Sequence, residues 1–280
     1  EIFERFSIDD RMNMSDFLLS YYQYRLAEFE DDAPEQLKSN KDAVLRYRFT
    51  LPVAKGVSET MELLAPPASG SRANLTVLGT GYQEDFGVSA RFGFAAVDYD
   101  ILSIQGGGLE NSELKIADLR FSVSRSSGIY LDYFDLVSIQ KINTRKTSLH
   151  GESNRSWRVS AGLQRRDLTC IDCQTLYLEG GVGKALVISD SLTGYGMLDV
   201  GTQLAPELIS VTPFLGLIFN AGTPFKAVVE VGSRVDHHNK SGDTVIRFDS
   251  RYALSKKHQI RFGFEHYRAS EYRLELFYYW

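Results

Sequence analysis

The stretch KHQIRFGFEHYRASEYRLELFYYW, residues 257–280, decides the fold. From residue 271 onward, apolar and charged side chains alternate: Tyr272, Leu274, Leu276, Tyr278 and Trp280 take one face, and Glu271, Arg273 and Glu275 take the other. A period of two residues is that of a β-strand with one apolar and one polar face. The stretch therefore predicts amphipathic strands rather than helices.

The same alternation extends back to Arg72 and predicts about twelve strands. They cover residues 72–82, 85–97, 113–124, 128–142, 155–166, 174–188, 192–204, 207–220, 223–235, 242–253, 257–267 and 270–280. Most are much longer than the ~5–6 residues of an ordinary globular strand. Long strands in even number, joined as hairpins, are typical of bacterial membrane barrels. We predict an all-β fold, an antiparallel transmembrane β-barrel of about 12 strands at 72–280; a soluble β-protein is the alternative.

The composition is compatible with this fold. The 280 residues include 17 Phe and 15 Tyr, and the mean hydropathy of −0.21 suits strands that are apolar on one face only. No stretch approaches the ~18–20 uninterrupted apolar residues of a membrane-spanning helix. The net charge of −5 argues against a nucleic-acid partner.

Residues 1–71 predict a short α-helical periplasmic segment and a linker. Ser15 is the expected N-cap of a first helix, whose apolar residues recur at helical spacing up to Phe29. A second, weaker helix is expected over 35–48, and three prolines mark a linker over 51–71. The chain opens without a cationic signal peptide, so an exported form is expected to have lost its signal or to belong to a longer protein.

Strand parity predicts the orientation in a Gram-negative outer membrane. If the helices are periplasmic, the N- and C-termini lie on the periplasmic side. The connections after odd-numbered strands are mostly short, whereas the long connections 99–112 and 143–154 then face the periplasm. This arrangement predicts a periplasmic working or docking face.

The polar faces of the strands carry both signs of charge and point into the predicted lumen. In a narrow barrel such side chains pair across the interior, so we expect a salt-bridged, largely blocked lumen. A polar conduit or ligand site and a catalytic lumen are the alternatives. The residues expected in this charge network are Arg158, Glu179, Arg247, Asp249, Arg251, Arg261, Glu265, Arg273 and Glu275.

No motif points to catalysis, a cofactor or a resident metal. The sequence lacks a nucleophile elbow and a zinc-protease helix, and Gly106-Gly107-Gly108 lacks the helix and lysine of a nucleotide site. His150 has no acid partner at a recognisable spacing. His237 and His238 lie in a turn, where metal binding would be adventitious. We expect no catalytic residues, no cofactor and no metal site.

Cys170 and Cys173 are the two cysteines of the chain. There is no second pair, and the nearest histidine in sequence is His150, which argues against a zinc site. In an oxidising compartment we expect a local disulfide that pins a loop. A reduced, idle pair is the alternative.

Several segments together resemble one bacterial family. They are LGTGY at 78–82, FAAVDYD at 94–100, FDLVSI at 134–139, SWRVSAGL at 156–163 and LEGGVG at 178–183, with FLLSYYQYR at 17–25 and LRYR at 45–48 before them. The chain resembles the C-terminal barrel, with its helical connector, of a family whose full-length members begin with a periplasmic Lnb-type, cysteine-hydrolase-like domain. That domain has no counterpart here, and Cys170 and Cys173 do not match its nucleophile region.

The resemblance implies anchorage of a periplasmic domain. The leading hypothesis is an outer-membrane barrel that anchors or scaffolds a periplasmic, hydrolase-like partner. A narrow channel or transporter, and a barrel enzyme acting on lipid or peptide, are the alternatives. Expected partners are outer-membrane lipid, a periplasmic protein and the outer-membrane assembly machinery, whose signal is similar to the terminal pattern of Leu274, Leu276, Tyr278 and Trp280.

Overall fold

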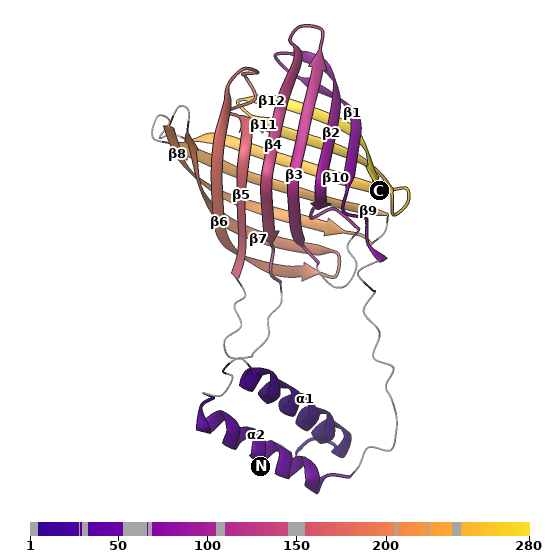
Figure 1. Ribbon diagram of the computed structural model, residues 1–280, viewed down its shortest axis with the longest axis vertical. Coiled ribbons are helices and arrows are strands. Elements are labelled where there is room, and N and C mark those ends of the chain that lie inside the picture. Colours follow the sequence, from indigo (N-terminus) through magenta and orange to yellow (C-terminus); the bar gives the residue numbers. More distant parts are fainter. Residues whose placement is uncertain are drawn as a thin grey trace. The chain divides into compact units, whose positions relative to one another are not determined.

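The structure is a computed structural model that describes residues 5–27, 29, 33–52, 66, 69–104, 110–144, 155–204, 207–222, 224–236 and 242–280. The chain divides into two compact units, Glu1–Leu63 and Leu64–Trp280. The described part of the first is helical, and that of the second consists of long strands (Figure 1).

The first unit contains α1 (Ile8–Ala27) and α2 (Glu35–Thr50). An ion pair of 2.7 Å between Arg48 and Asp16 joins the two helices. The prediction that Ser15 caps the first helix is wrong. The helix begins earlier because Ser7 Oγ accepts a hydrogen bond from the Asp10 amide, whereas Ser15 is buried within the helix and donates to the Arg11 carbonyl. Neither described helix is long and apolar enough to cross a bilayer.

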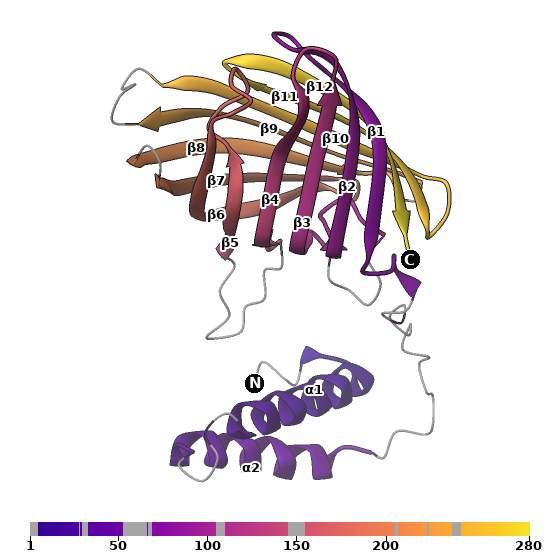
Figure 2. The ribbon, with the colours of Figure 1, turned by 45° about the horizontal axis from the view of Figure 1, so that its top comes forward.

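The described part of the second unit forms a closed barrel of twelve antiparallel strands, which confirms the predicted fold class. Each strand pairs with the next along the chain, and β1 pairs with β12 to close the barrel, as Figure 2 shows from a second direction. The strands are β1 (Leu75–Gln83), β2 (Gly87–Tyr99), β3 (Ser112–Ser124), β4 (Gly128–Lys141), β5 (Arg155–Arg165), β6 (Gln174–Ser189), β7 (Leu192–Leu204), β8 (Glu207–Asn220), β9 (Phe225–Asp236), β10 (Asp243–Ala253), β11 (His258–Tyr267) and β12 (Ala269–Tyr279).

The two-residue period sorts side chains between the outside and the lumen. In β12, Tyr272, Leu274, Leu276 and Tyr278 are exposed, while Glu271, Phe277 and Tyr279 are buried. Elsewhere the outer face is equally apolar: Leu215 on β8 is 72% exposed and Val182 on β6 is 62% exposed. Because water solvates apolar surface poorly, a continuous outer face of this kind suits the hydrocarbon of a bilayer.

Aromatic rings lie near both ends of the barrel. We call the end where β1 begins and β12 finishes the terminal rim, and the opposite end the far rim. Near the far rim, Tyr272 packs against Tyr82 at 6.4 Å and against Phe264 at 5.0 Å between ring centroids. Near the terminal rim, Trp280 packs against Phe94 at 6.4 Å. Aromatic girdles at both edges of an apolar band are typical of outer-membrane barrels.

The alternation is interrupted in β3 and β4. Ala117 has a φ of 53°, in the left-handed region that residues other than Gly rarely adopt. After it, Asp118 and Arg120 are buried on the lumen side. The pairing of β3 with β4 shifts next to Phe121, and that of β4 with β5 shifts near Asp135. Such bulges bring extra charged side chains into the lumen.

Candidate functional site

Arg91 on β2 is the centre of a first ion-pair network inside the barrel. Its guanidinium lies 2.7 Å from Glu271, 3.0 Å from Glu275 and 3.3 Å from Asp132, measured to carboxylate oxygens. Arg165 on β5 pairs with the same Glu271 at 2.8 Å and with Asp132 at 3.3 Å. These contacts connect β2, β4, β5 and β12 through the lumen.

Arg158 on β5 is the centre of a second network. It pairs with Asp199 on β7, with Glu179 at 3.4 Å and with Glu230 at 3.5 Å, and its guanidinium lies 4.3 Å from the centroid of the Phe214 ring. The network continues through Arg247 to Glu265 at 3.4 Å, and through Arg273 to Asp249 at 3.4 Å. Buried charges are costly unless they are paired in this way.

The structure distributes the nine predicted network residues over four environments. Arg158, Glu179, Arg247, Glu265, Arg273 and Asp249 belong to the second network, and Glu275 belongs to the first. Arg261 pairs instead with Asp100, beyond β2. Arg251 is buried, and no ion pair joins it to any other described residue. A functional role for these charges stays a prediction.

A polar cavity of about 370 Å³ lies in the lumen. Among the described residues, twelve acidic and eight basic side chains line it, so its wall carries an excess of acid. No group of three or more His, Cys, Asp or Glu side chains in the described ranges is placed to hold a metal ion. The charged and hydroxyl-bearing side chains of the wall offer hydrogen bonds and charge pairing to a polar solute.

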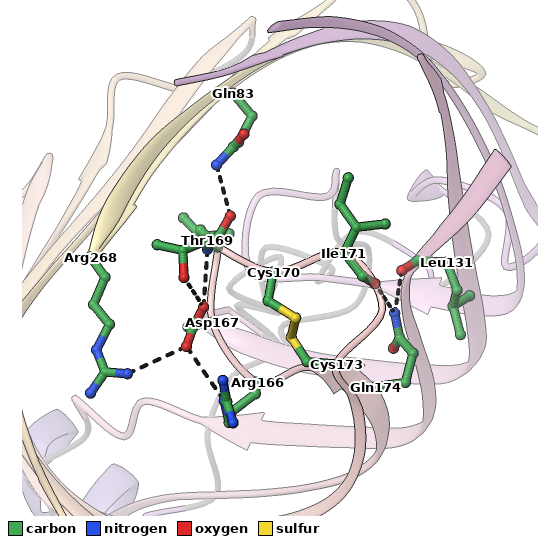
Figure 3. Close-up of a disulfide and its surroundings, with 11 residues drawn as sticks. Gln83, Leu131, Arg166, Asp167, Thr169, Cys170, Ile171, Cys173, Gln174 and Arg268 are labelled. Atoms are coloured by element: carbon green, nitrogen blue, oxygen red, sulfur yellow. Dashed lines mark hydrogen bonds and ion pairs between the residues drawn. A yellow bond between two sulfur atoms is a disulfide. The ribbon is translucent and has the colours of Figure 1, made fainter. Parts of the chain in front are cut away.

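The connection between β5 and β6, residues 166–173, folds across the lumen at the far rim; we call it the strap (Figure 3). The Leu168 carbonyl accepts a hydrogen bond of 2.7 Å from Gln83 Nε2 on β1. The Asp167 carboxylate lies 3.3 Å from the guanidinium of Arg268, in the turn between β11 and β12. That turn belongs to the opposite wall of the barrel, so the strap spans the mouth.

The strap is also held internally. Asp167 accepts hydrogen bonds from the Thr169 amide (3.0 Å) and hydroxyl (2.6 Å), and the Arg166 amide donates to the Cys173 carbonyl at 3.0 Å. Burial alone would raise the pKa of the Asp167 carboxyl, but the Thr169 donors and the neighbouring guanidinium groups hold it below its ordinary value. The structure joins Cys170 to Cys173 as a disulfide, visible in Figure 3; the redox state of the pair stays a prediction.

The turn after β2, residues 100–104, folds into the lumen from the terminal rim; we call it the plug. Ile101 and Leu102 pack with residues of β7 and β8, including Tyr195 and Phe214, in one buried apolar cluster. The turn is closed by Asp100 Oδ1, which accepts hydrogen bonds from the Leu102 amide and the Ser103 hydroxyl. Burial would raise the pKa of Asp100, but the Arg261 guanidinium beside it lowers that pKa below its ordinary value.

Several lumen residues were missed by reasoning from the sequence. Asp118 and Arg120 face the lumen because the alternation breaks at Ala117, and Asp98, fully buried, accepts a hydrogen bond from the Tyr279 hydroxyl at 3.0 Å. The strap and the plug are connections, for which a strand period makes no prediction. The Cys170–Cys173 spacing was the one sequence signal that pointed to a constrained loop.

A family model described as "Domain of unknown function (DUF7840)" matches residues 65–280, most of the chain. This chain belongs to the DUF7840 family. The match covers the barrel and leaves the resemblance to a family with an N-terminal hydrolase-like domain as a prediction. No curated protein sequence matches the chain.

Among solved structures, the DUF7840 barrel is similar to several outer-membrane proteins. A KdgM porin in complex with disordered oligogalacturonate has a TM-score of 0.45 at 10% identity, over 74% of this chain and 99% of that one. A NanC porin has a TM-score of 0.46 at 6% identity, over 73% and 100%. The outer membrane channel DcaP of Acinetobacter baumannii has a TM-score of 0.36 at 8% identity, over 74% and 96%. These likenesses are too distant to carry an argument about function.

Some predicted features of the DUF7840 chain lie outside the described residues. They are His150, His237, His238, the glycine run at 106–108, residues 105–109 of the connection 99–112 and residues 145–154 of the connection 143–154. Their roles, including docking at the long connections, stay predictions.

Proposed function

We propose that the barrel is a narrow outer-membrane channel for small polar solutes, that the plug narrows its terminal mouth, and that the strap holds its far mouth closed in this structure. The observation that carries the proposal is the polar cavity of about 370 Å³ inside a barrel whose outer face is apolar. That volume lies within the ~300–1,000 Å³ of ordinary small-molecule sites.

The outer face supports a location in the outer membrane of a Gram-negative bacterium. The exposed side chains of the strands are apolar over the middle of the barrel and aromatic near both rims. Protein extracted from purified outer membranes is expected to migrate differently in electrophoresis when boiled and unboiled, because a closed barrel resists detergent until heated. Recovery in the soluble fraction with no mobility shift would contradict this location.

The lumen supports passage of polar rather than apolar solutes. The cavity wall is dominated by paired charges, and connections rather than strands lie across the two mouths. A connection moves without breaking a strand ladder, so opening the far mouth leaves the barrel intact. We place the gate at the strap because polar contacts tie it to the opposite wall.

Osmotic swelling of proteoliposomes tests the channel. Vesicles containing the wild-type protein are expected to admit small polar solutes slowly, and a variant with residues 167–172 replaced by an Asn-Gly turn is expected to admit them faster. A size series from glycine to a trisaccharide gives the cutoff. Asp172→Asn, a change at an exposed strap residue, is the matched control. Equal swelling of empty and protein-containing vesicles for both proteins would exclude a channel.

Anchoring a periplasmic partner is the second candidate, because the helical unit exposes large apolar side chains. Phe17 is 56% exposed, Tyr24 is 65% exposed and Phe49 is 81% exposed. Such side chains are typical of surfaces that bind a partner. Photo-crosslinking from position 49 in cells is expected to capture a periplasmic protein, and crosslinking from Asn40 serves as control. The same result at both positions, or no adduct, would remove support for anchoring.

A further inference from the structure

Three cations stand side by side on the lumen face near the terminal rim. Arg251 on β10 is the register partner of Lys226 on β9 and of Arg261 on β11. All three side chains are buried: Lys226 is 5% exposed, Arg251 is 3% exposed and Arg261 is 7% exposed. Like charges at directly opposed positions repel one another unless something compensates for them.

Only one of the three cations is compensated within the described part of the chain. Arg261 pairs with Asp100 and donates to Gln259 Oε1 at 2.8 Å and to the Tyr279 hydroxyl at 3.0 Å. No ion pair or hydrogen bond joins the side chain of Lys226 or Arg251 to another described residue, and the buried Nε and Nη1 atoms of Arg251 have no partner. Guanidinium N–H groups are strong, directional hydrogen-bond donors, so these two buried nitrogens are free to donate to a ligand.

The neighbouring acids leave the cluster positive. Asp100 and Glu110 are the acidic groups that act on Lys226, and Asp100 is the acidic group that acts on Arg251. Asp100 is already paired with Arg261, however, and Glu110 is exposed and lies beyond ion-pair distance of Lys226. Buried cations with free donors and no acid in contact are the arrangement that binds an anion.

We propose that Lys226 and Arg251 form a binding site for one oxyanion, a carboxylate or a phosphate group, at the terminal mouth. Arg251 supplies a planar pair of donors that matches two oxygens of such a group, and Lys226 supplies a point charge beside it. Both residues lie close to the strand ends, next to the ladder pair of Tyr252 and Phe225, so the anion enters from the terminal mouth. Arg261 keeps Asp100 and the plug in place rather than contacting the anion.

Thermal unfolding of the detergent-folded full chain tests the site, with inorganic phosphate and acetate as separate probes at constant ionic strength. The wild-type midpoint is expected to rise saturably with at least one of them. Arg251→Gln and Lys226→Gln are each expected to raise the half-saturating concentration about tenfold, because each removes one charged contact to the anion. Arg234→Gln, a cation on β9 that packs over the Tyr267 ring, is the matched control and is expected to keep the wild-type response.

The two probes also identify the ligand class. A response to phosphate alone indicates a phosphate group, and a response to both indicates a general oxyanion site. A linear, unsaturable rise shared by wild type and all variants would be a general salt effect and would overturn the proposal. If Arg251→Gln does not fold, Lys226→Gln and Arg251→Lys give the same comparison, and no saturable response in the wild type overturns the proposal regardless of the variants.

Discussion

The connections that lie across the two mouths of the barrel are held by different physical means. At the far rim, the strap is tied to the opposite wall by an ion pair from Asp167 to Arg268 and a hydrogen bond from Gln83 to Leu168. At the terminal rim, the plug is held by apolar burial, with Leu102 only 2% exposed. When a mouth opens, hydrogen bonds to water replace lost polar contacts in large part, whereas water does not compensate for the exposure of buried apolar side chains.

We therefore expect the strap to act as a gate and the plug to act as part of the apolar core. Releasing the strap costs a few polar contacts that water replaces. Releasing the plug exposes Ile101 and Leu102 and uncovers the apolar side chains of β7 and β8 against which they pack. The plug is therefore expected to affect the stability of the barrel, and the strap is expected to affect its permeability.

The largest expected effect is on stability at the plug. Leu102→Ala is expected to lower the free energy of unfolding by about 2–5 kcal/mol, because it removes a fully buried side chain and leaves a cavity. Urea unfolding of the lipid-folded protein measures the change. Leu178→Ala, on the lipid-facing side of β6, is the control and is expected to cost much less. Equal losses for both variants would mean that the plug is not core.

The next effect is on opening at the strap. Asp167→Asn weakens contacts with Arg268 and Thr169 that are worth about 1.5–3 kcal/mol as charge-assisted hydrogen bonds. The open probability in planar bilayers is therefore expected to rise about tenfold or more. Asp172→Asn, in the same connection but exposed, is expected to leave it unchanged. A similar rise in both variants would point to a general loosening of the strap.

A smaller effect is expected from the disulfide. Replacing both cysteines, Cys170→Ser with Cys173→Ser, removes a short loop closure, which stabilises less than the about 3 kcal/mol of a 15-residue loop. The variant is expected to open more often than the wild type but less often than Asp167→Asn. A reductant is expected to raise the opening frequency of the wild type to that of the double-serine variant, and to leave the variant unchanged. A response of the variant would show that the reductant acts elsewhere than on the disulfide.

The smallest effect in the neutral range is that of pH. The pKa of Asp167 is lowered below its ordinary 3.8. The stabilisation of the closed strap by the ionised carboxylate is therefore fully present above that value and is lost as the pH falls through the lowered pKa. Opening is expected to be constant from pH 7 to about 5 and to rise only in stronger acid. In strong acid, the open probability of the wild type is expected to approach that of the Asp167→Asn variant. A difference between the two that persisted in strong acid would contradict a charge-held strap.

The barrel was predictable from the sequence because period-two alternation persists over long strands, as it does from Ile260 to Phe264 and from Tyr272 to Tyr278. The start of α1 was not predictable in this way, because the choice between Ser7 and Ser15 as N-cap depends on which hydroxyl accepts a hydrogen bond from a free backbone amide. The lumen was predictable only where the period holds. At Ala117 one left-handed residue changes which side chains face inward, and the strand pattern carries no trace of it.

The role of the predicted charges stays a prediction, and the partners that the structure gives them were not foreseeable from the sequence. Arg261 pairs with Asp100 because the plug folds back into the barrel, and Arg91 meets Glu271 and Glu275 because β1 and β12 close the sheet. These contacts depend on the closure of the barrel by β1 and β12 and on the path of the plug, neither of which a strand period predicts. The same holds for the strap, where Asp167 meets a residue 101 positions away in sequence.

The single-channel current of the wild type, compared with that of the strap-shortened variant, tests the proposed channel, with both proteins shown to be folded by heat-modifiable migration. We expect rare, small openings in the wild type, and frequent, larger openings once the strap is gone. Silent bilayers for both folded proteins would contradict a channel and would leave anchoring as the function to pursue. Equal, frequent openings in both would keep the channel and contradict the strap as its gate.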